Sequence, residues 1–318
     1  MPAALYNPTL EEVQFAQEAA WGDAAAPTIP LAGVTSCKIT PKIESSQIVD
    51  KRASTMPAYI AAVNRIGGEA DLSGVVTYTQ VQYLLNAMFT ADAATPFTYI
   101  AALTPATPTT WNLLYGQSGL CYAMSGAVMD KLVIKGDTNG PLTFDAHFQG
   151  KAPVALARVA LDEPSVIVAM GGQTKLYVDP IATAHGTTEW PLTGLSFELT
   201  IQNDRHPVYH LGTLNPDNFA NGKWGGGLHI VAEMTALSKA LLTSALAATV
   251  EPVGYNVRLI AAGSGTSNLT MDFSGQLLTA PIMFTDQDGV TTAELDFAPS
   301  YSAQAAMLSC FKFSNVAS

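Results

Sequence analysis

Histidines that could bind a metal stand close together at one place in the chain. His206 and His210 have the HxxxH spacing that places two imidazoles on one face of a helix. A zincin also needs a glutamate directly after the first histidine, and Pro207 occupies that position. The remaining histidines are isolated along the chain: His147, His185 and His229. These residues therefore predict loop and sheet contacts, and no metal site.

A short acidic run resembles part of a calcium-binding loop. Asp286-Gln287-Asp288-Gly289 lacks the third acidic position and the distal glutamate of such a loop. Asp137-Thr138-Asn139-Gly140 occupies the matching place in an earlier stretch, between two apolar segments. Asn-Gly tolerates the positive φ values of a two-residue hairpin turn. Both runs are predicted to be turns.

Glycine clusters and carboxylate pairs give no sign of catalysis. Gly171-Gly172 and Gly225-Gly226-Gly227 form neither GxGxxG nor GxxxxGK[ST], so no phosphate cradle is predicted. Gly116-Gln117-Ser118-Gly119 lacks the GxSxG spacing of a nucleophile elbow. Glu69 and Asp71 share one face of an expected strand, where such pairs are usually solvated. We predict no enzyme, no catalytic residue, no cofactor and no metal ligand.

The composition indicates a folded chain with large buried surfaces. The 318 residues suffice for two domains of about 150 residues each. Charged residues make up 13% and hydrophobic residues 48%, which suits a protein that buries surface against copies of itself, although a large monomeric core gives the same composition.

The charge pattern argues against specific nucleic-acid binding. The net charge is −11, and Lys51-Arg52 is the longest run of basic residues. A binder normally concentrates cations against phosphates. An acidic surface could instead repel nucleic acid.

Cysteine use and the N-terminal sequence indicate assembly in a reducing cytoplasm. Cys37, Cys121 and Cys310 are odd in number and far apart, so they predict no disulfide framework. The N-terminus carries acidic residues and no basic region, unlike a signal peptide. No apolar run approaches the about 20 residues of a membrane span.

One hairpin pattern occurs twice. Residues 126–148 (GAVMDKLVIKGDTNGPLTFDAHF) match residues 275–297 (GQLLTAPIMFTDQDGVTTAELDF) without gaps at an offset of 149. Turn residues, glycines and apolar positions agree together. This agreement predicts an internal duplication.

The flanking elements repeat in the same order, namely strand, loop, glycine turn, strand, helix, loop and hairpin. In the first half we expect a strand at 34–49, a loop at 50–57, a turn at 66–68, a strand at 69–76 and a helix at 78–89 capped by Thr77 or Thr79. In the second half we expect a strand at 195–201, a loop at 203–221, a turn at 225–227, a strand at 228–234 and a helix at 235–247.

These elements predict a mainly β fold with two similar antiparallel β-sandwich or barrel domains, each with one flanking α-helix. We place an N-terminal arm at 1–33, with a short helix at 10–20, the first domain at 34–158, a linker at 159–190 and the second domain at 191–318. Two interpretations of the arm remain open. It becomes ordered only when it contacts a neighbouring molecule, or it is a simple surface helix.

The ordered set of motifs resembles a known family. An acidic N-terminal segment ending in Trp21-Gly22, a strand at 34–43, a loop with Lys51-Arg52, and Gly67-Gly68-Glu69-Ala70-Asp71-Leu72-Ser73-Gly74 before the helix at 78–89 look like the tail tube (major tail) proteins of long-tailed bacteriophages. Both hairpins fit the same pattern.

The resemblance implies a structural virion protein that forms rings, stacked into a tube through which DNA passes without specific binding. Family members with one tube domain form hexameric rings, so a duplicated chain is expected to form trimeric rings with pseudo-sixfold symmetry. Implied partners are other copies of the chain, a tape measure protein, and tail terminator and baseplate proteins, with assembly in the host cytoplasm and no membrane.

Two other classes remain open from the sequence. One is another ring-forming component, such as a tail terminator, baseplate hub or injection-system tube. The other is a carbohydrate-binding or hydrolytic β-protein, which the chain does not favour because it lacks aromatic residues clustered beside paired carboxylates.

Overall fold

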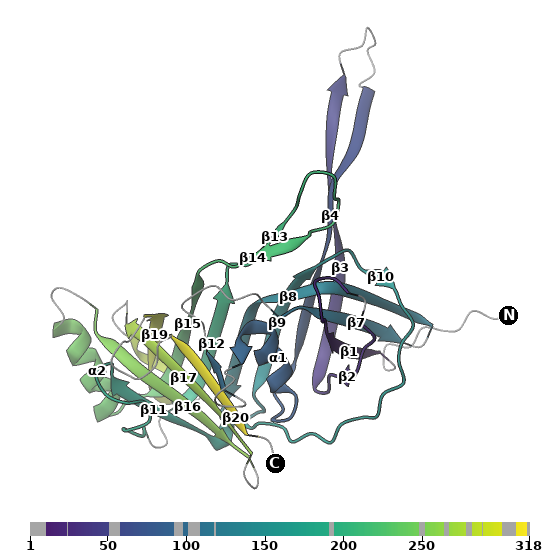
Figure 1. The fold of residues 1–318 in the computed structure, drawn as a ribbon. Helices are drawn as coiled ribbons and strands as arrows, with labels where there is room; N and C mark the ends of the chain where they lie inside the picture. The colour runs from purple at the N-terminus through teal and green to yellow at the C-terminus, as the bar shows by residue number, and fades with distance from the viewer. Residues whose placement is uncertain are drawn as a thin grey trace.

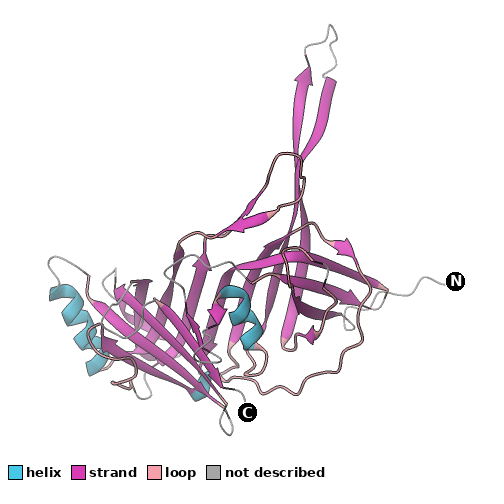
Figure 2. Cartoon of the chain, in the orientation of Figure 1, coloured by secondary structure: helices cyan, strands magenta, loops and turns pink. Residues whose placement is uncertain are grey.

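Most of the described chain forms β-strands, because buried and exposed residues alternate along it. The described residues also contain two α-helices (Figure 2). The computed structural model describes residues 11–23, 25–50, 58–91, 98–100, 109–117, 119–190, 194–247, 252–263, 267–277, 282–287, 289–300 and 310–316. Neither described helix is long and apolar enough to cross a membrane.

The first half contains ten strands and one helix within these ranges. They are β1 (Glu12–Gln17), β2 (Ile29–Pro30), β3 (Val34–Asp50), β4 (Ala58–Val75), α1 (Val81–Met88), β5 (Thr90–Ala91), β6 (Thr98–Ile100), β7 (Trp111–Gln117), β8 (Leu120–Asp137), β9 (Thr143–Gly150) and β10 (Val154–Ala155).

The second half follows after residues 156–170, which we call the strap and which cross the molecule (Figure 1). Its elements are a 3-10 turn (Gly171–Gln173), β11 (Thr174–Pro180), β12 (Gly194–Asn203), β13 (His206–Val208), β14 (Asn218–Ala220), β15 (Trp224–Glu233), α2 (Ala236–Ala247), β16 (Gly254–Ala262), β17 (Asn268–Leu277), β18 (Ile282–Gln287), β19 (Val290–Pro299) and β20 (Phe311–Val316).

Eight strands form a continuous antiparallel ladder in the order β3-β4-β9-β8-β12-β15-β19-β18. We call these strands the eight-strand ladder. Its two groups of four follow the same strand order, and a helix follows β4 and β15 in turn. The registers also correspond, because Ala70 pairs with Phe148 and Leu228 pairs with Phe297, at offsets of 158 and 149.

Further strands join the two halves into one sheet. β8 pairs with β7 through its first part, and β17 pairs with β16 in the corresponding place. β8 pairs with β12, and β6 pairs with β20, so one antiparallel sheet links eighteen of the described strands. The mainly β fold is confirmed. The division into two β-sandwich or barrel domains stays a prediction, and the described strands of the two halves are joined by the β8–β12 and β6–β20 pairings.

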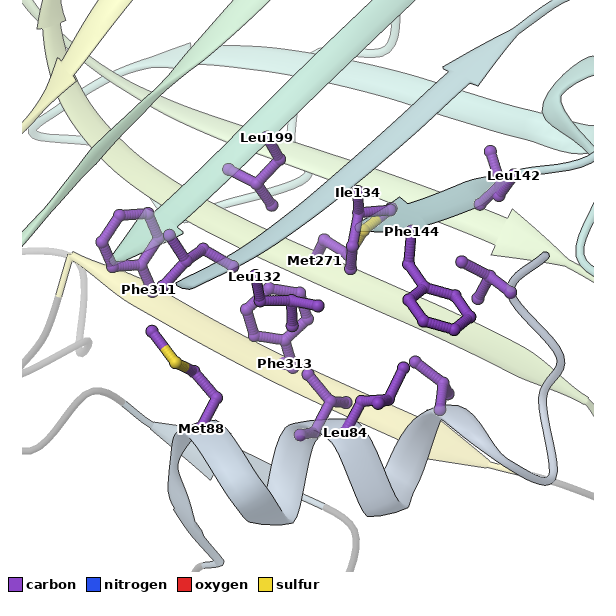
Figure 3. Close-up of a cluster of buried hydrophobic side chains, with 14 of the residues drawn as sticks. Leu84, Met88, Leu132, Ile134, Leu142, Phe144, Leu199, Met271, Phe311 and Phe313 are labelled. Atoms are coloured by element: carbon purple, nitrogen blue, oxygen red, sulfur yellow. The ribbon is translucent and has the colours of Figure 1, made fainter. Parts of the chain in front are cut away.

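The apolar face of the ladder and α1 form a core that both halves share (Figure 3). Leu84 and Met88 of α1 lie against Phe311 and Phe313 of β20, together with Leu132 of β8. All five side chains are at most 2% exposed. The C-terminal strand therefore covers the helix of the first half.

The N-terminal segment does not form the predicted helix at 10–20. Residues 12–17 form β1, which pairs with β7. Phe15 is fully buried, with its ring 5.6 Å from that of Trp111 and 5.7 Å from that of Phe148. Burial of Val13 and Phe15 in the sheet outweighs the helix propensity of the surrounding Glu, Gln and Ala residues.

The predicted glycine turns are also wrong. Gly67 and Gly68 lie inside β4, and Gly226 lies inside β15. A Cβ on Gly68 would lie 2.7 Å from the Lys151 carbonyl oxygen. Gly226 has a φ of 117°, and a Cβ there would lie 2.0 Å from the Thr200 carbonyl oxygen. Both glycines permit close approach of neighbouring backbone.

The two repeated hairpins are confirmed, but their turns differ. Five residues (138–142) connect β8 to β9, and neither Asn139 nor Gly140 has a positive φ, so the predicted two-residue turn is wrong there. In the second hairpin Gln287 pairs with Val290, and Gly289 has a φ of 80°.

The two helices are confirmed, but the predicted cap of the first is not. Gln80 precedes α1 as its N-cap and makes no side-chain capping bond, so neither Thr77 nor Thr79 has this role. The strands expected at 34–49, 69–76, 195–201 and 228–234 are present within β3, β4, β12 and β15. The loop expected at 203–221 contains the short pair β13–β14.

Two further expectations concern the loop at 50–57 and the linker at 159–190. Residues 51–57 of the expected loop lie outside the described residues. Within the stretch predicted as linker, β11 forms seven pairs with β16. β3 and β4 together extend well beyond the body of the molecule (Figure 1).

Candidate functional site

Polar side chains gather on the face of the eight-strand ladder opposite the core. We call this surface the polar ladder face. Along β9, Asp145 and His147 point to it while Phe144, Ala146 and Phe148 are buried on the other face. Charged residues on this face come from seven strands and include Lys38, Lys42, Glu69, Asp71, Asp130, Lys131, Lys135, Asp145, His147, Glu198, His229, Glu233, Glu294 and Asp296.

His147 is surrounded by carboxylates. Its Nδ1 lies 2.5 Å from Oδ1 of Asp130, and its Nε2 lies 4.0 Å from carboxylate oxygens of Glu69 and Asp71. A bulge in β8 between Met129 and Lys131 brings Asp130 to this face. The hydrogen bond to Asp130 raises the pKa of His147, although burial opposes the shift. The site therefore favours the imidazolium form.

The second half has a histidine–carboxylate pair at the corresponding rung. His229 and Asp296 are directly opposite on β15 and β19, with Nδ1 of His229 2.7 Å from Oδ1 of Asp296. Asp71 and His147 are directly opposite on β4 and β9. At offsets of 158 and 149, Asp71 corresponds to His229 and His147 to Asp296. The two positions therefore carry one imidazole and one carboxylate in each half, with the residue types exchanged. The closest side-chain atoms lie 2.7 Å apart in the second half and 4.0 Å apart in the first.

A lysine connects the halves on this face. Nζ of Lys135 lies 3.2 Å from Oδ2 of Asp145 on β9 and 3.6 Å from Oε2 of Glu198 on β12. The hydrogen bond to Asp145 raises the pKa of Lys135, which stays charged. Lys42 is likewise 2.7 Å from Glu69. Carboxylates thus neutralise two of the four lysines of this face.

Among the residues named above the balance of charge on the polar ladder face is negative, because eight carboxylates outnumber four lysines. A hollow of 440 Å³ lies over its centre, lined by residues that include Lys38, Asp71, His147 and Glu198. The net negative charge of this face disfavours a polyanion. The hollow itself is lined by three lysines (Lys38, Lys131 and Lys135) and three carboxylates (Asp71, Asp145 and Glu198). No group of His, Cys, Asp and Glu residues suited to a metal ion occurs within the described ranges.

The predicted histidine pair lies elsewhere, in the loop that carries β13 and β14. His206 is exposed beside the Asp204 carbonyl oxygen, and Nδ1 of His210 lies 3.0 Å from Oδ2 of Asp217. The acidic turns are turn chemistry, as predicted, because the Asp137 carboxylate accepts the Asn139 N–H at 2.8 Å and the Asp286 carboxylate accepts the Gly289 N–H at 3.1 Å.

Sequence reasoning did not find the polar ladder face. The alternating polar positions of β4, β9, β15 and β19 are visible in the sequence, but the pairing of Asp71 with His147 depends on a register between strands 76 residues apart. The sequence signal that could have related the two histidine–carboxylate pairs is the offset between the halves, which is 158 residues from Asp71 to His229 and 149 residues from His147 to Asp296.

Comparison with known proteins identifies the family. The sequence model of a family described as phage tail tube protein matches residues 11–303. No protein among the curated ones that were compared matches significantly. The matched range covers both halves of the eight-strand ladder and the polar ladder face. The chain therefore belongs to the phage tail tube protein family and is a structural protein of the virion tail.

Proposed function

We propose that the protein polymerises as stacked rings and so forms the tube through which phage DNA passes into the host. The observation that carries this proposal is the eight-strand ladder. Within the described residues its two end strands, β3 and β18, are each paired on one side only. Its two groups of four strands correspond in register, and carboxylates outnumber lysines among the named residues of its polar face. A subunit of this kind can extend its sheet laterally into a ring with one face inward.

The two halves are proposed to be duplicated tube units, and three chains then complete a ring with pseudo-sixfold symmetry. Corresponding pairs support the duplication: Leu72 with Ala146 matches Ile230 with Leu295, and Val133 with Asp145 matches Ile282 with Glu294. We place the units at residues 34–158 and 191–318, joined by residues 159–190, with residues 1–33 preceding them. Because β11 pairs with β16, its residues 174–180 associate with the second unit.

The polar ladder face is proposed to line the bore. DNA must slide through a tube without being held, and each free lysine that contacts phosphate would retain it through counterion release. Lys42 and Lys135 are paired with Glu69, Asp145 and Glu198, which reduces that attraction. The excess of carboxylates supports a lining that repels the phosphate backbone.

The β3–β4 hairpin is proposed to contact the next ring. β4 pairs with β9 from Gly68 to Val75, and the remainder of the β3–β4 hairpin extends away from the body of the molecule (Figure 1), so it can reach a molecule stacked above or below. A tape measure protein inside the bore, and terminator and baseplate proteins at the ends, are the further proposed partners. Assembly takes place in the host cytoplasm, consistent with three free cysteines.

Negative-stain microscopy of the purified chain tests the proposal. We expect rings and tubes, with threefold symmetry at high resolution and pseudo-sixfold symmetry at low resolution. A monodisperse monomer at high concentration would contradict it. Single rings that never stack would favour the alternative of a terminator or baseplate hub, because a tube requires many rings.

A further inference from the structure

The loop between β12 and β15 holds the same place in its half as the outer part of the β3–β4 hairpin holds in the other half. Trp224 and Ile66 correspond at the offset of 158, and each pairs with a residue of the preceding strand. Before them the chain makes two excursions of nearly equal length, residues 204–223 and residues 44–65. We call the first the folded loop and the second the projecting hairpin. By position in the ladder the two are counterparts.

The two counterparts follow different paths. The ladder of the projecting hairpin continues as far as Asp50 opposite Ala58, away from the body of the molecule (Figure 1). The folded loop contains only the three pairs of β13 with β14, and it lies back along the base of the projecting hairpin (Figure 1). Pro207 and Pro216 lack the N–H groups of a continuous ladder. Both prolines therefore disfavour a second long hairpin.

The folded loop is anchored on the first half near its two ends. Arg205 is buried, and its guanidinium donates to the carbonyl oxygens of Ala87 at 3.2 Å and of Met88 at 2.9 Å. Phe219 is also buried, and its ring centroid lies 5.1 Å from that of Trp21. These two anchors fix the position of the segment between them.

That middle segment contacts the base of the projecting hairpin. The Leu214 carbonyl oxygen accepts the Ile66 N–H at 2.8 Å. The guanidinium carbon of Arg65 lies 4.9 Å from the centre of the Tyr209 ring, within the range of a cation–π interaction. β4 pairs with β9 from Gly68 onward. The folded loop therefore supplies a hydrogen-bond partner to β4 just beyond the end of β9.

We infer that the folded loop is a brace that holds the projecting hairpin in its direction away from the body. A two-stranded ribbon is by itself only marginally stable in water, so contacts at its base decide how firmly it is held. The inference rests on the proposed stacking of rings. A hairpin that is already held loses less conformational entropy when it meets the next ring, so the brace favours stacking.

The brace also determines the symmetry of the contact between rings. A ring of three chains has six hairpin positions, of which three carry projecting hairpins and three carry folded loops. The contact between stacked rings then has true threefold symmetry, whereas the ladder repeats six times around the bore. The duplicated units have thus taken different roles at the end of the ring from which the hairpins project.

Hydrogen exchange of the unassembled full-length chain tests the brace. Tyr209→Ala removes the ring beside the Arg65 guanidinium, and the amides of residues 61–66 are expected to exchange about fivefold faster. Tyr209→Phe retains the ring and should exchange like the wild type. Leu211→Ala is the matched control, because Leu211 lies in the same loop and is fully exposed. Unchanged exchange in Tyr209→Ala, or an equal increase in Leu211→Ala, would overturn the inference.

Assembly gives a second readout. Tyr209→Ala is expected to form tubes more slowly than the wild type, with an unchanged circular dichroism spectrum, and Tyr209→Phe to form them at the wild-type rate. Cryo-electron microscopy of wild-type tubes should show three hairpin contacts between successive rings, and six equal contacts would contradict the folded loop as a brace. A wild-type chain that forms no rings would contradict the proposed function alone, because hydrogen exchange still decides the brace in the single chain.

Discussion

His229 and Asp296 lie opposite each other on β15 and β19 at the position where Asp71 and His147 lie opposite each other on β4 and β9, with the two residue types exchanged. The exchange keeps one imidazole and one carboxylate on the same rung of the polar ladder face in each half. Cross-strand pairs of opposite charge stabilise a sheet by about 0.2–1 kcal/mol. This pair of opposite positions therefore accommodates the histidine on either of its two strands and the aspartate on the other.

Reversing the second pair tests this equivalence. His229→Asp and Asp296→His are each expected to lower the free energy of unfolding, and the double variant is expected to recover most of the loss. A double-mutant cycle by urea unfolding measures the coupling, which should be about 0.2–1 kcal/mol. A reversed pair that is no more stable than the sum of the two single effects would refute the equivalence.

The carboxylates around His147 predict a pH dependence of stability. The folded-state pKa is raised above the unfolded value of about 6.5, chiefly by the hydrogen bond to Asp130. The protonated form therefore contributes stability that is fully present below about pH 6.5 and is lost as the pH rises through the folded pKa. As the pH rises from about 6.5 through the folded-state pKa, the excess free energy of unfolding of the wild type over His147→Gln should decrease. Urea unfolding at a series of pH values measures this change.

His206→Gln is the control for the His147 experiment. The ring of His206 is exposed, beside a backbone carbonyl oxygen of Asp204. Its substitution at the exposed surface is expected to change the free energy of unfolding by no more than about 0.5 kcal/mol. A wild-type advantage over His147→Gln that grows with rising pH would show that the sign is wrong.

Arg205 is a buried charge that ties the loop after β12 to the end of α1. Its guanidinium donates to the carbonyl oxygens of Ala87 and Met88 and to that of Met129, and its Nε donates to Asn221 Oδ1 at 3.0 Å. Burial lowers its pKa to about 10, so it stays charged near neutral pH.

Arg205→Met is expected to destabilise the fold by about 3 kcal/mol or more, because hydrogen bonds to a charged group contribute about 1.5–3 kcal/mol each. The Ala87 and Met88 carbonyl oxygens at the helix end would lose their partner. Arg65→Met, at a side chain that is 54% exposed, is the matched control and should have little effect. Equal losses of unfolding free energy in the two variants would contradict this role.

Gly226→Ala separates steric clash from backbone strain. Gly226 and Gly119 both have positive φ, at 117° and 90°, but a Cβ on Gly119 would meet nothing within 4 Å. Gly119→Ala should therefore lose only the backbone strain, on the order of 1–3 kcal/mol. Gly226→Ala should lose clearly more, since its Cβ would contact the Thr200 carbonyl oxygen. Thermal unfolding of both variants measures the difference, and similar losses would argue against the clash.

Local patterns predicted those parts of the fold whose signals are local. Period-two alternation located β9 and most of the ladder, and helical spacing located α1 and α2. The offset between the hairpins related β8 and β9 to β18 and β19. These signals need no knowledge of which strands are neighbours.

What could not be predicted depends on neighbours. β1 has the composition of a helix, and its pairing with β7 decided its conformation. Gly68 and Gly226 resemble turn residues, but they are small because another backbone passes close to them. The Asp71–His147 contact requires a register that no short segment contains.

The pairing of β8 with β12 within one polypeptide has a consequence for assembly kinetics. The two partners of this contact are tethered, so it forms at an effective concentration that the strap sets and that dilution does not change. In a ring built as proposed, every second junction is thus complete before two molecules meet. Growth then requires half as many collisions as it would with single-unit subunits.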